Sequence, residues 1–421
     1  MKVTLLTVGS RGDVQPMLAL GRELADAGHE ARMATHPSFE ALVEKAGLPF
    51  APLAEGKISA GDTPEGRRWI ETDSRYLPTW VGYLKDARTV LRERLSDALR
   101  ACEDSDAVIA SDLATLLGWQ MADHYGRPLI RVNLNLPARA GSWHGPLPRA
   151  ARQAAWRIAR AWLDPARRDA GLPALPAAEP LSELDRNQSL VLRAYSAAVG
   201  ALPTQGRDWV KVTGYWFLGH QLDPDPPLAL LDFIAAGSTP VCVDFGSMLE
   251  ADPDETIGMV IEALERSGRR GVLILGRHRH GKVELPGSVF GVDAASHDLL
   301  FGRCAAVVHH AGAGTTAAAL RAGVPSVTVP HTVDQMRWAG RVHELGVASA
   351  PIRRRRLSAG GLHAAIAAAT EDSGMNARAA SLSETVRAES GTARAREVLE
   401  EYLGRRRRSP GIEGALEMAS G

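Results

Sequence analysis

Residues 305–330 read AAVVHHAGAGTTAAALRAGVPSVTVP, and their order of residue types decides the fold. An apolar run ends in two histidines, a stretch of Gly, Ala and Thr follows, and a second β-branched run closes the segment. Short apolar runs of this kind are typical of buried parallel strands, whereas the Ala-rich stretch between them predicts a helix that begins at about Ala313 to Thr316. We therefore expect a strand, a helix and a second strand of an α/β sheet.

The first half of the chain shows the same alternation. The apolar run KVTLLTV at 2–8 stops at a glycine, a helical pattern follows, and HEARMAT begins the next strand. The runs at 106–112 and 128–134 flank a second helical pattern in the same way. These strand–helix–strand units predict an open parallel sheet. Arg-, Trp- and Ala-rich helical stretches at 66–101 and 148–170 interrupt it, and we expect them on the substrate side of the sheet.

A Pro-rich segment separates the two halves. Residues 213–240 contain one short helical pattern and end the first α/β region, which makes them a linker. The strand and helix patterns then restart at PVCVDFGSM, so we predict two Rossmann-like, doubly wound parallel-sheet domains. Their bounds are 1–212 and 241–385, followed by a helix at 386–403 and a loose tail at 404–421.

The composition is that of an ordinary globular protein and excludes several classes of function. The 421 residues include 49 Lys and Arg against 49 Asp and Glu, so no net charge attracts nucleic acid or an anionic membrane. The first apolar run is too short for a signal peptide, and no stretch of about 18 apolar residues follows. The 3 cysteines have no metal-ligand spacing. We expect a cytoplasmic protein without stable membrane insertion, either a monomer or a homodimer.

The Gly- and Ala-rich stretch after the two histidines has the features of an anion site. The first backbone N–H groups of a helix are free to bind an anion, and the helix dipole adds to the attraction. Gly312 and Gly314 permit close approach, Thr315 can donate its hydroxyl, and His310 can donate a ring N–H. The alternative is that the small residues only let the helix pack tightly on the sheet.

Three carboxylates lie where strands end or helices begin. Asp13, in the loop after the first strand, is a candidate general base or a simple helix cap. Asp112, at the end of its strand, supports that base, orients an acceptor or is itself a cap. Asp334 and its neighbour Gln335 bind sugar hydroxyls or cap the helix that they begin. The residue pattern alone leaves these interpretations open in each case.

Other motifs lack parts that their chemistry requires. GRHRHGK at 276–282 resembles a P-loop, but Val283 stands where the magnesium-binding Ser or Thr belongs. The chain contains no HExxH, GxSxG or CxxC sequence, which leaves metalloprotease, serine hydrolase and dithiol chemistry without support. The DPD carboxylate pairs are typical of turns, so no metal site is predicted.

Several stretches together resemble one enzyme family. They are GSRGDVQPMLALGRELADAGHEARMAT, TGYWFL, PVCVDFGSM, HDLLFGRCAAVVHHAGAGTTAAALRAGVPSVTVP and DQMRWAGRVHELGV, and they span most of residues 1–400. The ordered set is similar to the nucleotide-sugar glycosyltransferases of the GT-B fold, in the bacterial natural-product branch that includes the vancomycin-type enzymes, with sterol glucosyltransferases as relatives. The resemblance implies two domains that face a cleft and a last helix that crosses back to the first domain.

The resemblance also implies roles for individual residues. Asp13 takes the place of the catalytic base, and Asp112 that of a residue that supports the base in related plant enzymes. Ala311 and Asp244 stand where the family commonly has glycine. The donor-binding residues that the resemblance implies are Ser10, Arg11, Gly12, Ser247, His297, His310, Gly312, Ala313, Gly314, Thr315, Asp334 and Gln335.

The activity that the resemblance implies is inverting glycosyl transfer. A sugar would move from a dTDP- or UDP-sugar to a hydroxyl group of a small hydrophobic natural product, with no metal ion or other cofactor. Asp13 would take the acceptor proton while His310 and the helix start meet the charge of the departing diphosphate. The alternatives are a catalytically silent relative that acts as a binding or activator protein, and a sugar-nucleotide epimerase.

Overall fold

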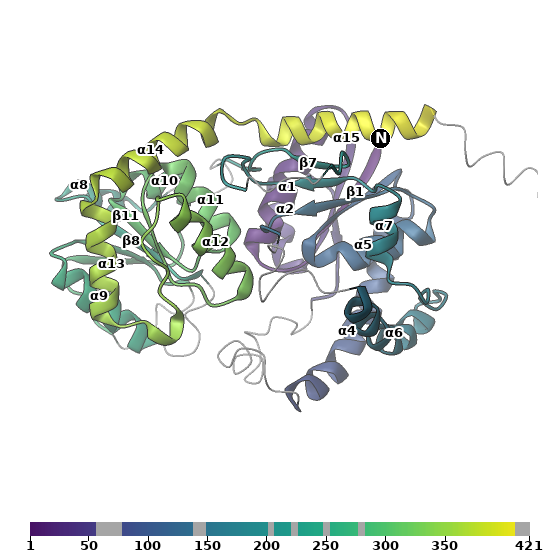
Figure 1. The fold of residues 1–421 in the computed structure, drawn as a ribbon, viewed down its shortest axis with the longest axis horizontal. Coiled ribbons are helices and arrows are strands. Elements are labelled where there is room, and N and C mark those ends of the chain that lie inside the picture. Colours follow the sequence, from purple (N-terminus) through teal and green to yellow (C-terminus); the bar gives the residue numbers. More distant parts are fainter. Residues whose placement is uncertain are drawn as a thin grey trace, which may run out of the picture.

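Two lobes, each built on a parallel sheet, make up the structure, which is a computed structural model (Figure 1). The two sheets confirm the predicted fold class. The residues that the structure describes are 1–55, 78–137, 149–200, 206–219, 226–246, 253–276 and 283–408.

The N-terminal lobe contains a seven-stranded sheet in the order β3-β2-β1-β4-β5-β6-β7. All of its paired strands run parallel. The strands are β1 (Lys2–Leu6), β2 (Glu30–Thr35), β3 (Phe50–Pro52), β4 (Ala107–Ser111), β5 (Leu129–Asn133), β6 (Val191–Arg193) and β7 (Val210–Val212).

The C-terminal lobe contains a five-stranded parallel sheet in the order β10-β9-β8-β11-β12. Its strands are β8 (Val241–Asp244), β9 (Gly271–Ile274), β10 (Val289–Val292), β11 (Ala306–His309) and β12 (Ser326–Thr328). In each lobe the chain adds strands first on one side of the initial strand and then on the other. Ligands of open α/β sheets bind at the carboxyl ends of the strands where this reversal occurs.

Helices cover both faces of each sheet, because alternate strand residues point to opposite faces. In the N-terminal lobe, Val3 and Leu5 pack in the core beneath α1 and α15, whereas Leu6 packs in the core beneath α4 and α5. The principal helices are α1 (Arg11–Asp26), α2 (Glu40–Lys45), α4 (Pro78–Cys102), α5 (Thr115–His124), α6 (Arg149–Asp169), α7 (Pro180–Arg186), α8 (Leu228–Ala235), α9 (Pro253–Arg266), α10 (His297–Leu300), α11 (Ala313–Ala322), α12 (Val333–Glu344), α13 (Ala359–Glu371), α14 (Ser373–Ala388) and α15 (Gly391–Arg408).

The last two helices run from the C-terminal lobe across to the N-terminal lobe (Figure 1). The break between α14 and α15 lies against the linker, where a Cβ on Gly391 would come within 2.2 Å of the carbonyl oxygen of Tyr215. Helix α15 then packs on α1, and its Arg396 forms an ion pair with Glu23 at 3.0 Å. It continues to Arg408, past the boundary at residue 403 that the sequence predicts.

A shared core joins the two lobes beside the linker. Trp338 of α12 is completely buried, and its ring packs edge-on against Tyr195 of the N-terminal lobe with 6.0 Å between centroids. Its indole Nε1 donates a hydrogen bond of 3.3 Å to Oδ1 of Asn135, which follows β5. The starts of the helices at the carboxyl ends of the two sheets are therefore held in one place relative to each other.

Candidate functional site

Residues 9–13, which lead from β1 into the first turn of α1, fold the carboxylate of Asp13 back over the helix start. Oδ2 of Asp13 accepts hydrogen bonds from the backbone N–H of Ser10 at 2.8 Å and from its hydroxyl at 2.9 Å. Gly9 has a φ of 122°, and a Cβ there would come within 2.5 Å of the same oxygen. Only glycine fits this close approach, so the loop is shaped around the carboxylate.

The environment of Asp13 makes its carboxylate a better proton acceptor. Burial is the largest effect and raises the pKa, the two hydrogen bonds from Ser10 lower it, and the nearby charges of Asp112 and Asp334 raise it again. The result is a pKa of about 6. A carboxylate with this pKa is ionised at neutral pH and still basic enough to take a proton from a reacting hydroxyl.

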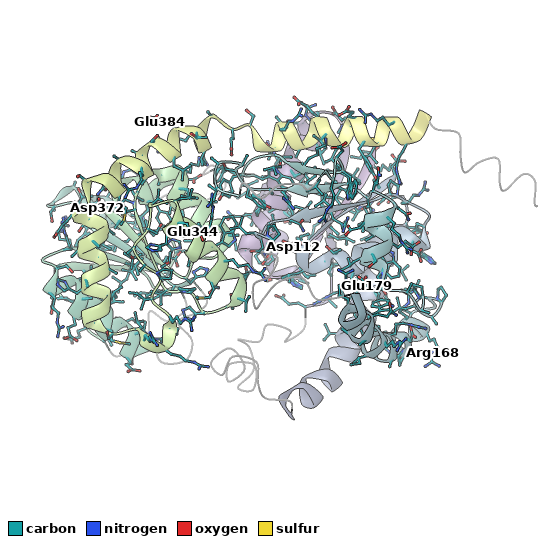
Figure 2. All side chains as sticks on the ribbon, viewed as in Figure 1. Asp112, Arg168, Glu179, Glu344, Asp372 and Glu384 are labelled. Carbon is teal, nitrogen blue, oxygen red and sulfur yellow. The ribbon has the colours of Figure 1, made fainter. Side chains whose placement is uncertain are left out.

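Asp112 begins the short helix Asp112–Ala114 after β4, and its oxygens are directed to the next loop. They accept hydrogen bonds from Nδ2 of Asn133 at 2.5 Å and from the backbone N–H groups of Leu134 and Asn135 at 2.8 and 3.2 Å. Burial raises its pKa and these bonds oppose the rise. In the described part of the chain no hydrogen bond joins it to Asp13, so its effect on Asp13 is one of charge. Figure 2 labels it on the side of its lobe that is nearer the other lobe.

Helix α11 begins at Ala313 with Gly312 as its N-cap, and no described side chain caps it. The first turn contains no acidic residue. The ring of His310 lies against the cap, because a Cβ on Gly312 would come within 2.4 Å of Nε2. His310 and residues 312–315, which we call the anion site, thus combine an imidazole with helix N–H groups that no described side chain caps. Such a helix start binds phosphate groups.

The turn into the anion site is unusual at Ala311. Its φ is 62°, in the left-handed region that glycine favours, and its side chain is fully buried. The backbone N–H of Ala311 donates to Nδ1 of His309 at 3.2 Å, which helps to hold the turn. The positive φ at this position explains why glycine is common there in the family that the sequence resembles, because glycine adopts such a φ without strain.

The carboxylate of Asp244 lies next to the anion site at the end of β8. Its Oδ2 lies 2.7 Å from Nε2 of His297, and its Oδ1 accepts from the backbone N–H of Gly246 at 2.7 Å. Burial by itself would raise the pKa of Asp244, but the hydrogen bond from His297, the nearby imidazoles and the bond from Gly246 outweigh it and give about 2. The pKa of His310 is lowered, chiefly by burial.

Asp334 and Gln335 begin α12 as a capping pair. Oε1 of Gln335 accepts from the backbone N–H groups of His331 and Thr332 at 2.8 and 3.2 Å, and Oδ1 of Asp334 accepts from the hydroxyl of Thr332 at 2.6 Å. Asp334 and Gln335 thus cap the helix, which is one of the two roles that the sequence leaves open. Their roles toward a sugar stay a prediction, and the charge of Asp334 acts on both Asp13 and His310.

The helix starts of the two lobes face each other. A Cβ on Gly314 of α11 would lie 3.6 Å from the Cα of Gly12 at the start of α1. The structure therefore brings the loop around Asp13 and the anion site together, and the charge of Asp334 acts on both. Ser10 and Arg11 are exposed at the start of α1, whereas Ser247 lies outside the described residues.

The sequence interpretation missed Asn133, Asn135 and Trp338. Asn133 and Asn135 hold Asp112 in place, and Asn135 also contacts Trp338 across the lobes. The signal that could have found the two asparagines is their place at the carboxyl end of a parallel strand, the edge where ligand sites of α/β sheets gather.

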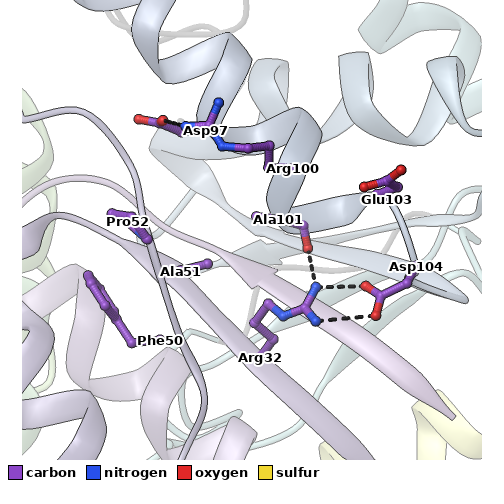
Figure 3. A pocket seen from close by; sticks show the side chains of 9 residues that line it. All are labelled: Arg32, Phe50, Ala51, Pro52, Asp97, Arg100, Ala101, Glu103 and Asp104. Atoms are coloured by element: carbon purple, nitrogen blue, oxygen red, sulfur yellow. Dashed lines mark hydrogen bonds and ion pairs between the residues drawn. The ribbon is translucent and has the colours of Figure 1, made fainter.

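A separate pocket lies beside β3, an edge strand of the N-terminal sheet, and the end of α4 (Figure 3). Its volume is about 420 Å³, and Arg32 crosses it to make an ion pair of 2.7 Å with Asp104 and a hydrogen bond to the carbonyl oxygen of Ala101. Arg32 belongs to β2, Ala101 to the last turn of α4, and Asp104 to the segment between α4 and β4. The pocket shares no lining residue with the loop around Asp13 or with the anion site.

The described ranges contain neither a candidate metal-ligand group nor a candidate membrane-spanning helix. They contain no group of three or more His, Cys, Asp or Glu side chains that could hold a metal ion. None of their helices is both long enough and apolar enough to span a bilayer.

Two family descriptions match the two halves of the chain. "Glycosyltransferase family 28 N-terminal domain" matches residues 3–116, and "Erythromycin biosynthesis protein CIII-like, C-terminal domain" matches residues 270–401. The sterol 3-beta-glucosyltransferase of Emericella nidulans is 34% identical over 94% of this chain and 29% of its own length. A sterol 3-beta-glucosyltransferase of Arabidopsis thaliana is 31% identical over 87% of this chain and 62% of its own length. The chain thus spans only part of either relative.

Solved structures with the same architecture come from natural-product pathways. The calicheamicin glycosyltransferase CalG4 superposes with a TM-score of 0.71 at 21% identity, over 96% of this chain and 98% of that one. The glycosyltransferase VinC, solved in complex with dTDP, gives a TM-score of 0.68 at 20% identity, over 96% and 100% of the two chains. The chain therefore joins a domain similar to the family 28 N-terminal domain to one similar to the erythromycin CIII-like C-terminal domain, and it has the GT-B fold of these solved glycosyltransferases.

Proposed function

We propose that the protein transfers a sugar from a nucleoside diphosphate sugar to a hydroxyl group of a hydrophobic acceptor, with inversion at the anomeric carbon. One observation carries the proposal: the start of α1, which holds Asp13, faces the anion site at the start of α11. The contact between Gly12 and Gly314 defines this arrangement. A proton acceptor and an anion site that face each other are what a single displacement needs, because nucleophile and leaving group lie on opposite sides of the reacting carbon.

The donor binds with its diphosphate at the anion site. The N–H groups of residues 313–315 and the ring of His310 stabilise the negative charge that grows as the bond between the anomeric carbon and the diphosphate breaks. Because these groups supply the charge compensation, the transfer needs no metal ion. VinC, which has the same fold, was solved in complex with dTDP, and this supports a nucleoside diphosphate as the ligand, so we expect a dTDP- or UDP-sugar here.

The acceptor binds on the side of Asp13. Oδ1 receives no hydrogen bond from the described residues, and in our proposal it takes the proton of the acceptor hydroxyl. The hydroxyl oxygen attacks the anomeric carbon, and the nucleoside diphosphate leaves with the electron pair of the broken bond. Holding both substrates between the lobes supplies the rest of the acceleration by proximity.

An apolar side chain stands next to this base. Leu113 is 63% exposed, and its Cδ1 lies 3.0 Å from the position that a Cβ on Gly9 would occupy, beside the carboxylate of Asp13. An exposed leucine at a reactive carboxylate fits an apolar substrate. The names of the relatives, sterol 3-beta-glucosyltransferases, support a sterol or a similar polycyclic alcohol as the acceptor.

The test separates transfer from donor binding. We would incubate the protein with UDP- and dTDP-glucose and a panel of sterols and polyketide alcohols, and detect glycosylated products by mass spectrometry. Asp13→Asn should lower kcat by about 10²- to 10⁴-fold, the usual contribution of a general base, while the calorimetric Kd for UDP changes by less than about twofold.

The matched control for Asp13→Asn is Asp26→Asn at the exposed end of the same helix. Asp26 contacts only Arg22 at 3.8 Å among the described residues, so its loss should leave transfer unchanged. Full activity in Asp13→Asn would refute the assigned base. Hydrolysis or epimerisation of the donor without any acceptor product would point to the epimerase alternative, and nucleotide binding without reaction would point to a silent relative.

A further inference from the structure

We propose that Asp244 is a positioning residue of the donor site, which holds the imidazole of His297 beside His310 so that both rings contact the departing diphosphate. The inference rests on the proposed function and extends it to a residue that stands where the family commonly has glycine. A carboxylate next to an anion site would by itself be expected to repel the ligand. The inference explains instead how Asp244 favours donor binding.

Both oxygens of Asp244 are used inside the protein. One is bound to the ring of His297 at 2.7 Å, and the other accepts from the backbone N–H of Gly246 at 2.7 Å. The side chain of Asp244 is 6% exposed, whereas that of His297 is 30% exposed. The carboxylate is therefore shielded from a ligand, and any effect of Asp244 on donor binding must pass through the histidine.

Two contacts fix the orientation of the His297 ring. Its plane stacks on Phe301 with centroids 4.4 Å apart and 17° between the planes. Its Nε2 is directed to Asp244, which selects the form with the proton on that nitrogen. The other nitrogen, Nδ1, remains for a ligand, and it donates to a phosphate oxygen when the ring is an imidazolium whose charge the carboxylate of Asp244 balances. A ring held in both plane and rotation loses little entropy when it binds.

The ring of His297 stands in the neighbourhood of the anion site. Asp244 pairs with His309 in the register of β8 and β11, and His310 follows directly. The charges of Asp244 and His297 both affect the pKa of His310. The charged or titratable groups around His297 are Asp244 from β8, His309 and His310 from β11 and its loop, and the pair of Asp298 and Arg321 from α10 and α11.

The sign of the effect distinguishes this inference from a simple electrostatic one. A buried carboxylate close to a diphosphate repels it, so a carboxylate that acted only through space would weaken binding and its removal would strengthen binding. A carboxylate that acts through His297 does the opposite, because its removal releases the ring. Burying a charge without such a partner is also costly, and a glycine would avoid the cost.

The experiment is a double-mutant cycle on nucleotide affinity, with UDP and dTDP as probes and calorimetry as the readout. We expect Asp244→Asn and His297→Gln each to weaken binding about tenfold, the effect of losing one hydrogen bond to a charged group. The double variant should bind no more weakly than His297→Gln alone, within about twofold, because the two residues act as one unit. Asp298→Asn, which removes a neighbouring acid paired with Arg321 at 3.1 Å, is the control and should bind like the wild type.

Each outcome decides the question. Tighter binding by Asp244→Asn, unchanged binding, or an equal loss in the presence and absence of His297 would overturn the positioning role. A wild-type protein that binds neither nucleotide would overturn the proposed function as well. If Asp244→Asn does not fold, as judged by its thermal transition without nucleotide, Asp244→Gly takes its place in the same cycle with the same expected result.

Discussion

Helices α1 and α11 begin in the same way, directly after a strand at the reversal point of their sheet, and their starts face each other. The four residues from the N-cap onward are Ser10 to Asp13 in α1 and Gly312 to Thr315 in α11. In α1 the third helical residue is an acid that turns back to accept the N–H of the N-cap. In α11 the same position is threonine, and no described side chain caps the helix.

This difference decides the chemistry of each helix start. An acid in the first turn uses the positive end of the helix for itself, so α1 has little capacity left for an external anion. Burial raises the pKa of the same acid to about 6, which makes it a proton acceptor. The start of α11 keeps its N–H groups for a ligand. One local structure thus gives a base or an anion site, depending on one side chain three residues after the cap.

The largest expected effect comes from making the two helix starts alike. Thr315→Asp places a carboxylate at the position that Asp13 occupies in α1. It should occupy the N–H groups and repel a diphosphate, and Coulomb energies at short range predict a loss of UDP affinity of about 10²- to 10³-fold. Calorimetry measures the loss directly.

Thr315→Asn is the control for shape without charge, and it should lose far less affinity than Thr315→Asp. Acids near a helix N-terminus stabilise the helix by about 0.3–1 kcal/mol, so the thermal transition of Thr315→Asp should not fall sharply. Wild-type UDP affinity in Thr315→Asp would show that nucleotides bind somewhere other than this helix start.

The pH dependence of transfer is the next effect in size. Asp13 acts as a base only when it is ionised, so kcat/KM should fall as pH decreases through about 6, the raised pKa of this residue. Below that value the loss should approach about tenfold per pH unit, and above it the rate should level off. Initial rates between about pH 4.5 and 8.5 give the profile.

A second profile tells whether the loss belongs to the base. The KM for the donor should change less than kcat/KM over the same range, because burial lowers the pKa of His310 below its ordinary range. A wild-type acidic limb centred near 4, the ordinary value for aspartate, would contradict the raised pKa of Asp13.

Elements that depend on short stretches of sequence could be predicted. The strands β1 and β11 are apolar runs followed by glycine-containing turns, and α11 begins at Ala313, where the pattern places it. The parallel sheets follow from the repeated strand and helix patterns, since such strands need crossover helices. The turn chemistry of residues 9–13 and 309–315 is likewise local.

Contacts between distant residues could not be predicted in the same way. Asp244 meets His297 across 53 positions, and Asn135 meets Trp338 across 203. These pairs depend on sheet register and on how the lobes pack, neither of which the local pattern encodes. The positive φ of Ala311 also escaped prediction, because a non-glycine residue there has no sequence signal.

The smallest expected effect separates two roles for Ser10. Its hydroxyl donates to the carboxylate of Asp13 at 2.9 Å and thereby lowers the pKa of that group, against the larger effect of burial. Ser10→Ala should raise the pKa by roughly half a unit, move the acidic limb of kcat/KM upward by the same amount, and lower the rate about twofold near pH 6. If Ser10 instead contacts the donor, as the resemblance implies, the KM for the donor rises equally at every pH while the limb stays in place. The two outcomes are distinct: a shifted acidic limb means that the Ser10 hydroxyl binds the carboxylate of Asp13, and a raised donor KM at every pH means that it binds the substrate.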